Sequence, residues 1–157
     1  MYILNALPAT VILGANGPVD IVKISEEMAC VIVACRSLVS AVGHQDTAAL
    51  FSTLLDADIP MNRISAPALT ASPLSATEEG VTIFSDFGSD GRPAWMLCGL
   101  LNGPRLPEGS TNLPQGAWIQ WVLVAPLEVT LFGGDTPRLV SAARAIADET
   151  YLRCQFF

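Results

Sequence analysis

Histidine and lysine each occur once in this sequence, and charged residues make up only 15% of it. With His44 as the single histidine and no Cys-x-x-Cys pair, the sequence has no zinc-ligand pattern, and any reaction that needs an imidazole has one candidate per chain. Eight basic residues stand against 15 acidic ones, so the net charge is −7 at pH 7. This balance argues against the basic surface that is typical of proteins binding duplex DNA or an anionic membrane.

Long hydrophobic runs are also missing. The longest, Met28 to Cys35, stops at Arg36 and is far shorter than the roughly 20 residues that a helix needs to cross a bilayer. No basic segment precedes the apolar start, so a signal peptide is not indicated. We therefore expect a soluble, cytoplasmic protein with no membrane contact. Its four cysteines are expected to be reduced and structural: Cys30, Cys35, Cys98 and Cys154.

Apolar residues are plentiful, at 51% of 157 residues. That length and composition suit a single domain, residues 1–157, with a sizeable core, and they exclude intrinsic disorder. The sequence has no repeat, no low-complexity tract and no obvious linker. Strand-like and helix-like segments alternate along the chain, which predicts an α/β fold with a mixed β-sheet flanked by helices.

Hydrophobic periodicity and turn-forming residues divide the chain into expected elements. The expected helices are Ser25 to about Ala34, Asp46 to Leu55, and Thr136 to about Thr150. The expected strands and extended segments are Tyr2–Leu7, Thr10–Leu13, Val19–Ile24 (an edge strand), Leu38–Val42, Ile59–Ile64, Val81–Phe87, Ala94–Leu101, Ala117–Val124 and Leu127–Phe132. We expect residues 65–79 to form a long surface loop, and the turn at residues 88–91 to join its two flanking strands.

Tryptophans fall within two of these strands. Trp95, Trp118 and Trp121 are expected to pack in the core, with stacking on a nucleic-acid base as the alternative.

His44 follows a strand and a glycine and comes immediately before an expected helix. A helix N-terminus presents unpaired N–H groups and the positive end of the dipole, and it therefore favours phosphate groups. A histidine there can donate a proton to a phosphate oxygen or to a leaving alkoxide near neutral pH. The alternative is that His44 is an ordinary surface or helix-capping residue.

A second candidate motif is Arg105-Leu106-Pro107-Glu108-Gly109. Arginine binds phosphate with two parallel hydrogen bonds, and Glu108 is placed to orient a hydroxyl group or the Arg105 side chain. The alternative is a plain turn carrying an exposed ion pair, which contributes little energy. Arg63 is open to the same two interpretations, phosphate contact or surface charge.

Taken in order, these motifs resemble those of a known family. The segments that carry the resemblance are Tyr2–Asn5, Ile24–Glu27, Val39–Ala48 (containing Gly-His-x-x-Thr), Pro60–Ile64 and Arg105–Gly109 (Arg-Leu-x-Glu-Gly). Together they are similar to the small viral anti-CRISPR ring nucleases of type III immunity and their bacterial relatives. The resemblance covers roughly residues 1–64 and 94–124.

The resemblance implies a homodimer that binds cyclic tetra-adenylate across its interface and switches off type III CRISPR signalling. It implies cleavage without metal or other cofactor, giving linear products with 2′,3′-cyclic phosphates. His44 matches the family's catalytic proton donor, and Arg105 and Glu108 match the catalytic residues of the second motif. The remaining matches are to substrate-binding positions: Asn5, Gly43, Thr47 and Arg63.

The sequence also departs from that family. Ala6 to Pro8 occupy a loop that often carries a hydroxyl side chain in the family. The stretch from Arg63 to Arg105 is longer, so residues 65–93 form either a lid or a longer hairpin. The core then spans about residues 1–125, and residues 126–157 are an added strand–helix extension.

Three functions stay open on the sequence alone. The first is the ring nuclease, whose nucleophile is the RNA's own 2′-hydroxyl, so the protein supplies positioning and charge stabilisation. The second is a protein of the same fold that binds a cyclic oligonucleotide without cutting it, as a sponge or sensor. The third is a structural or partner-binding protein.

Overall fold

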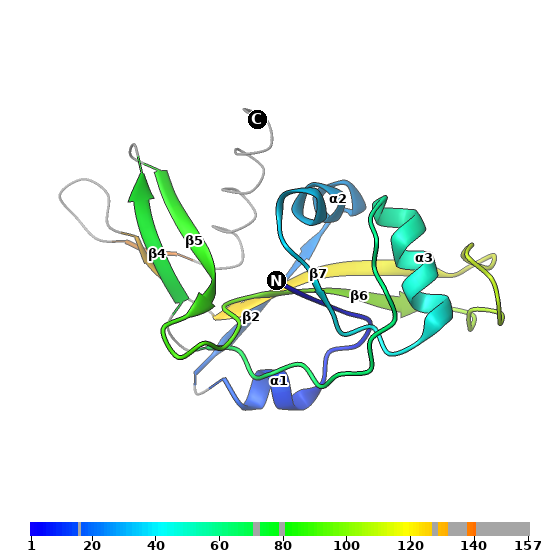
Figure 1. The fold of residues 1–157 in the computed structure, drawn as a ribbon, viewed down its shortest axis with the longest axis horizontal. Coiled ribbons are helices and arrows are strands. Elements are labelled where there is room, and N and C mark those ends of the chain that lie inside the picture. The colour runs from blue at the N-terminus through cyan, green and yellow to red at the C-terminus, as the bar shows by residue number, and fades with distance from the viewer. Residues whose placement is uncertain (16, 71–72, 79–80, 127–128, 132–137, 141–157) are drawn as a thin grey trace.

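The computed structural model describes residues 1–15, 17–70, 73–78, 81–126, 129–131 and 138–140. Within these residues, five strands form one mixed sheet in the order β2-β7-β6-β1-β3 (Figure 1). The five strands are β1 (Tyr2–Leu4), β2 (Val19–Ile24), β3 (Val39–Ser40), β6 (Met96–Asn102) and β7 (Trp118–Pro126). Helices pack against this sheet, so the predicted α/β fold is confirmed.

The direction of the strands determines which loops meet. β1 pairs in parallel with both β3 and β6, whereas β7 is antiparallel to β6 and to β2. The carboxyl ends of β1, β3 and β6 therefore lie at one edge of the sheet, here called the carboxyl edge. Asn5 follows β1, residues 41–44 follow β3, and the β6–β7 loop, residues 103–117, follows β6. Ligands of open α/β sheets commonly bind at such an edge.

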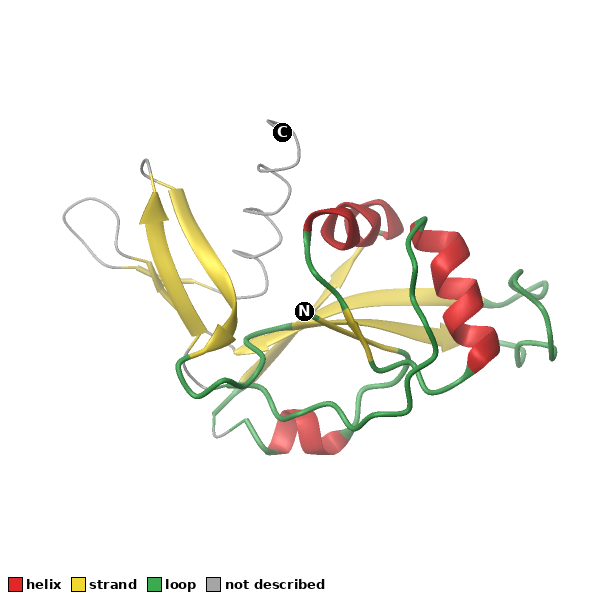
Figure 2. Ribbon diagram, viewed as in Figure 1, coloured by secondary structure: helices red, strands yellow, loops and turns green. Residues whose placement is uncertain are grey.

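Helices cover both faces of the sheet. α2 (Glu26–Cys35) and α3 (Gln45–Leu55) lie on one face, and the short α1 (Ala9–Leu13) lies on the other (Figure 2). The Ser25 hydroxyl accepts a hydrogen bond from the Met28 N–H at 3.1 Å, which confirms the predicted start of α2. No helix in the described part of the chain is both long and apolar enough to cross a membrane.

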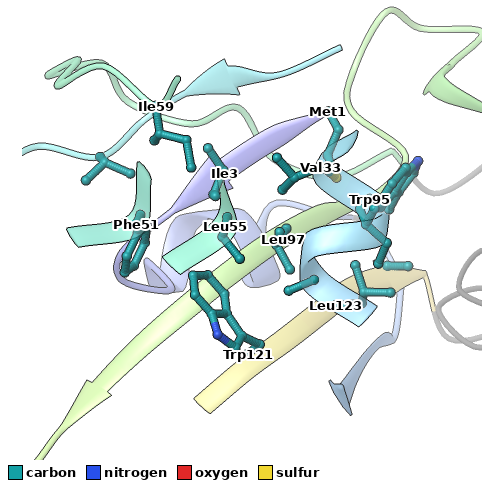
Figure 3. Packing of buried hydrophobic residues seen from close by; sticks show 14 of the residues in the cluster. Met1, Ile3, Val33, Phe51, Leu55, Ile59, Trp95, Leu97, Trp121 and Leu123 are labelled. Atoms are coloured by element: carbon teal, nitrogen blue, oxygen red, sulfur yellow. The ribbon is translucent and has the colours of Figure 1, made fainter. Parts of the chain in front are cut away.

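The larger core lies between the sheet and the pair α2 and α3. Phe51 of α3 packs against Trp121 of β7, with ring centroids 4.9 Å apart and planes inclined at 57° (Figure 3). Gly99 of β6 makes room for them, because a Cβ there would lie 2.6 Å from an atom of each ring. Trp95 and Trp121 are buried as predicted, but Trp118, the first residue of β7, is 53% exposed, so its predicted burial is wrong.

One further prediction about local structure is wrong, and another holds only in part. Residues Thr10–Leu13 are helical in α1, because burial of Val11 against the sheet overrides the strand preference of a Val-Ile pair. The segments around the 88–91 turn are strands, as predicted, but they pair only beside the turn, where Phe87 and Pro93 form an antiparallel bridge and the Ala94 N–H donates to the Asp86 carbonyl at 2.9 Å. β5 (Val81–Gly88) pairs with β4 (Pro73–Glu78), and β6 lies between β1 and β7.

The prediction of a surface loop at residues 65–79 is therefore wrong where β4 forms a strand. It is also wrong at Leu69 and Thr70, which precede β4 and are buried. Arg92 fixes the turn after β5: its Nη1 donates to the Gly14 carbonyl at 3.0 Å, and its Nε donates to Asp90 at 2.8 Å. Of the two alternatives for residues 65–93, the structure contains the hairpin. That hairpin lies at the opposite end of the molecule from the β6–β7 loop, so it is not a lid over the carboxyl edge (Figure 1).

Beyond Pro126, the described residues form a third sheet of two strands, β8 (Val129–Leu131) and β9 (Arg138–Val140). β8 lies within the strand predicted at residues 127–132. β9 contradicts a helix beginning at Thr136, because Arg138–Val140 pair as a strand. The rest of that predicted helix lies outside the described residues.

The cysteines differ from one another. Cys30 and Cys98 are free thiols, as predicted, but Cys35 is disulfide-bonded, so the prediction of a reduced thiol is wrong there. Cys154 lies outside the described residues. Sequence reasoning treated Cys35 as part of a buried apolar run, whereas α2 exposes it at the last turn.

Cys98 is expected to resist alkylation in the folded protein. It is fully buried in β6, and burial raises the pKa of its thiol from 9.0 to about 12, so the reactive thiolate is scarce. In the unfolded chain the Cys98 thiol ionises near its ordinary pKa of 9.0, whereas in the folded protein it stays protonated. The free energy of unfolding is therefore expected to fall as the pH rises from about 9 to 12. Mass spectrometry after iodoacetamide treatment at pH 8 should find Cys98 modified only when guanidinium is added. Rapid modification without denaturant would contradict this packing.

Candidate functional site

His44 occupies the N-cap position of α3. Its backbone is extended (φ −124°, ψ 132°), and its carbonyl accepts the Ala48 N–H at 3.0 Å, which begins the helix. Its side chain makes no capping hydrogen bond and is exposed. His44 therefore caps the helix with its backbone only, and its imidazole is available to a ligand at the positive end of the helix dipole.

Gly43 connects two other predicted residues. Its N–H donates to Asn5 Oδ1 across a long 3.5 Å, and its carbonyl accepts from Arg63 Nε at 3.1 Å. A Cβ added at Gly43 would meet no atom within 4 Å, so a ligand can approach the backbone there closely. Asn5, Gly43 and Arg63 thus form one contact group beside His44.

Arg63 reaches this position because the segment before it runs along β3. Asn62 donates its N–H to the Val42 carbonyl and its side-chain amide to the Ser40 carbonyl, both at 2.9 Å. The Ser40 hydroxyl donates to the Pro60 carbonyl at 2.6 Å. The segment at residues 59–64, which was predicted to be extended, therefore lies beside β3 and is hydrogen-bonded to it and to the residues after it. It does not form a regular strand.

The β6–β7 loop brings the second motif to the same edge. The Gly109 N–H donates to Asp46 Oδ1 in the first turn of α3 at 3.1 Å. At the base of the loop, Gly103 has φ +88°, and a Cβ there would lie 2.5 Å from the Gly116 carbonyl oxygen, so both backbone shape and space require glycine. Sequence reasoning gave Asp46 no role beyond starting a helix, because its partner lies 63 residues away.

The side chains of Arg105 and Glu108 are exposed, and over the described ranges neither forms an ion pair. Of the alternative, an ordinary turn with an exposed ion pair, the structure has the turn at residues 107–110 but not the ion pair. Thr47 is half-buried in the first turn of α3, one turn along from His44. All seven predicted site residues lie on segments that end or begin at the carboxyl edge.

The charges at this edge are mixed. Arg63, Arg105 and the N-terminus of α3 are positive, while Asp46 and Glu108 are negative. In the part of the chain that the structure describes, no group of three or more His, Cys, Asp or Glu side chains is placed to hold a metal ion. The arrangement offers an imidazole, two guanidinium groups and a helix N-terminus, which are groups that bind phosphate.

Comparison with known proteins gives three findings. No curated protein matches the chain. The model of the STIV B116-like family matches residues 1–70, which include Asn5, Gly43, His44, Thr47 and Arg63 but not the β6–β7 loop. Among solved structures, B116 of Sulfolobus turreted icosahedral virus matches with a TM-score of 0.52 and 20% sequence identity, over 79% of this chain and 97% of that one. The first 70 residues are thus similar to the STIV B116-like family, and the matched 79% of the chain has the fold of the viral protein B116.

Proposed function

We propose that this chain is a ring nuclease that acts as a homodimer, binds cyclic tetra-adenylate and opens it without metal, thereby switching off type III CRISPR signalling. One observation carries the proposal: the carboxyl ends of β1, β3 and β6 bring an exposed histidine at a helix N-terminus to the same edge as two exposed arginines. The choice of substrate and reaction is supported by the resemblance of the Gly-His-x-x-Thr and Arg-Leu-x-Glu-Gly motifs to those of the ring nucleases.

In this reaction the protein does not supply the nucleophile. The 2′-hydroxyl of one ribose loses its proton to water and attacks the adjacent phosphorus, the bond to the 5′ oxygen breaks, and the product ends in a 2′,3′-cyclic phosphate. His44 gives its proton to the leaving 5′ oxygen, which otherwise departs as an alkoxide. Arg105 and Arg63 neutralise charge on the phosphate oxygens, and Glu108 orients the attacking hydroxyl or the Arg105 side chain. The backbone at Gly43, with Asn5 and Thr47, holds the ribose and phosphate in line.

A homodimer fits a symmetric ring. Two-fold symmetry doubles every group at the edge, giving two His44 and two Arg105 side chains around four phosphates. The net charge of −7 opposes capture of the ring at long range. Screening over about 8 Å at physiological ionic strength limits that repulsion, so the local arginines and helix N-termini decide binding.

Incubation with labelled cyclic tetra-adenylate in excess EDTA tests the proposal. A ring nuclease converts the label into linear products ending in 2′,3′-cyclic phosphate. Tight binding without product would instead identify a sponge or sensor. Absence of both binding and product would leave a structural or partner-binding protein. Sedimentation of the same sample, with and without the ring, tests the homodimer.

A further inference from the structure

One hydrogen bond joins the two candidate motifs, from the Gly109 N–H to Asp46 Oδ1 at 3.1 Å. We propose that Asp46 is a positioning residue for ring opening, and that it holds the Arg105–Glu108 segment against the first turn of α3. This inference rests on the proposed function and adds to it a residue with a specific task.

The geometry makes this bond an effective point of attachment. Gly109 is at φ +75°, a left-handed conformation that glycine adopts without strain, and the Ser110 N–H donates to the Pro107 carbonyl at 3.1 Å to close a turn around it. Glu108 directly precedes the anchored residue, and Arg105 is four residues before it. At the other end of the bond, Asp46 is two residues after His44. The bond therefore fixes the distance between the proton donor and the Arg105 loop.

The choice of an acidic residue has an electrostatic cost. A carboxylate in the first turn of α3 interacts well with the helix dipole but repels a phosphate bound at the same terminus. A neutral amide would accept the same hydrogen bond without that repulsion, although more weakly, because hydrogen bonds to charged groups are stronger. The bond and the charge thus act in opposite directions on ring binding, and substitutions can separate them.

Asp46→Ala removes both the acceptor and the charge. Without its anchor the Arg105–Glu108 segment moves away from His44, and the transition state loses its charge stabilisation. We expect kcat to fall by about 10–100-fold, the value of a hydrogen bond to a charged group, while KM changes by about threefold at most. Asp46→Asn keeps an Oδ1 acceptor, so it restores most of kcat and lowers KM.

A matched control removes a negative charge just beyond the other end of the same helix. Asp58 is exposed just after the C-terminal end of α3. Asp58→Ala is expected to leave both kcat and KM within about twofold of the wild type, because a charge that far from the carboxyl edge is screened.

A readout without ligand tests the anchor itself. In nuclear magnetic resonance spectra, hydrogen exchange of the Gly109 amide should be several-fold faster in Asp46→Ala than in wild type, with Asp46→Asn close to wild type. Thermal unfolding of each variant checks that the fold is intact. If Asp46→Ala does not fold, Asp46→Ser replaces it, because a hydroxyl keeps a polar first turn but ends one bond short of the Oδ1 position.

The outcomes separate the two proposals. If wild type neither binds nor opens the ring, the proposed function fails, and this inference fails with it even where the Gly109 exchange shows the anchor. If wild type opens the ring and Asp46→Ala does so at the same kcat, the inference alone is overturned. Equal losses in Asp46→Ala and Asp58→Ala, or no recovery in Asp46→Asn, would also overturn it. Loss of kcat in Asp46→Ala, recovery in Asp46→Asn and faster Gly109 exchange together support it.

Discussion

Replacing His44 with alanine is expected to slow ring opening by about 10²–10⁴-fold, the usual value of a positioned general acid. The leaving 5′ oxygen would depart without a proton. No other histidine can take the place of His44, because the sequence contains only one. Binding should change by only a few fold, since Arg63, Arg105 and the backbone at Gly43 stay in place. Single-turnover rates with labelled cyclic tetra-adenylate, measured beside equilibrium binding, separate the two effects.

The neighbouring Gln45 supplies the control for this substitution. Gln45 is exposed at the first position of α3, so Gln45→Ala alters the same helix end without removing a proton donor. It should retain the wild-type rate within about twofold, since surface substitutions away from special features have small effects. A His44→Ala variant that cuts as fast as Gln45→Ala would rule out His44 as the proton donor.

The largest loss of stability is expected from Phe51→Ala. Phe51 is fully buried between α3 and the sheet, and its ring packs on Trp121 at 4.9 Å. Removing it leaves a cavity beside Gly99, which has no side chain to fill the space, so the free energy of unfolding should fall by about 3–5 kcal/mol. Urea denaturation followed by tryptophan fluorescence measures the change, because Trp121 reports on the same contact.

Thr53 on the solvent side of α3 provides the comparison. Its side chain is exposed and donates a hydrogen bond to the Ala49 carbonyl at 3.0 Å within the helix. Thr53→Ala should change stability by about 0.5 kcal/mol or less. If Phe51→Ala and Thr53→Ala were equally stable, the contact between Phe51 and Trp121 would not be what holds α3 on the sheet.

Because Phe51 packs the helix that begins after His44 against the sheet, we also expect Phe51→Ala to lower activity at temperatures where the protein is still folded.

Local signals in the sequence were sufficient for most elements. Ser25 followed by two glutamates placed the start of α2, and the apolar spacing from Leu50 to Leu55 placed α3. The glycine before His44 marked the change from strand to helix. These features depend on residues within one or two turns, and such short-range periodicity and capping are readable without knowledge of the fold.

Pairing between strands was not readable in this way. Residues 81–87 and 94–101 carry good strand patterns around a turn, yet β5 pairs with β4, and β6 enters the centre of the larger sheet. A strand pattern specifies which side chains face inward but not which neighbour supplies the hydrogen bonds. The exposure of Trp118 depends in the same way on how the strands assemble.

By itself, the sequence determined that this chain is an α/β protein with one imidazole at a strand-to-helix junction, because amphipathic period and helix capping are local properties. Only the tertiary structure decided that β1, β3 and β6 run in the same direction and that Asp46 receives the Gly109 N–H. The physical reason is that a contact across 63 residues depends on how the whole sheet is packed, and no short segment of the chain carries that information.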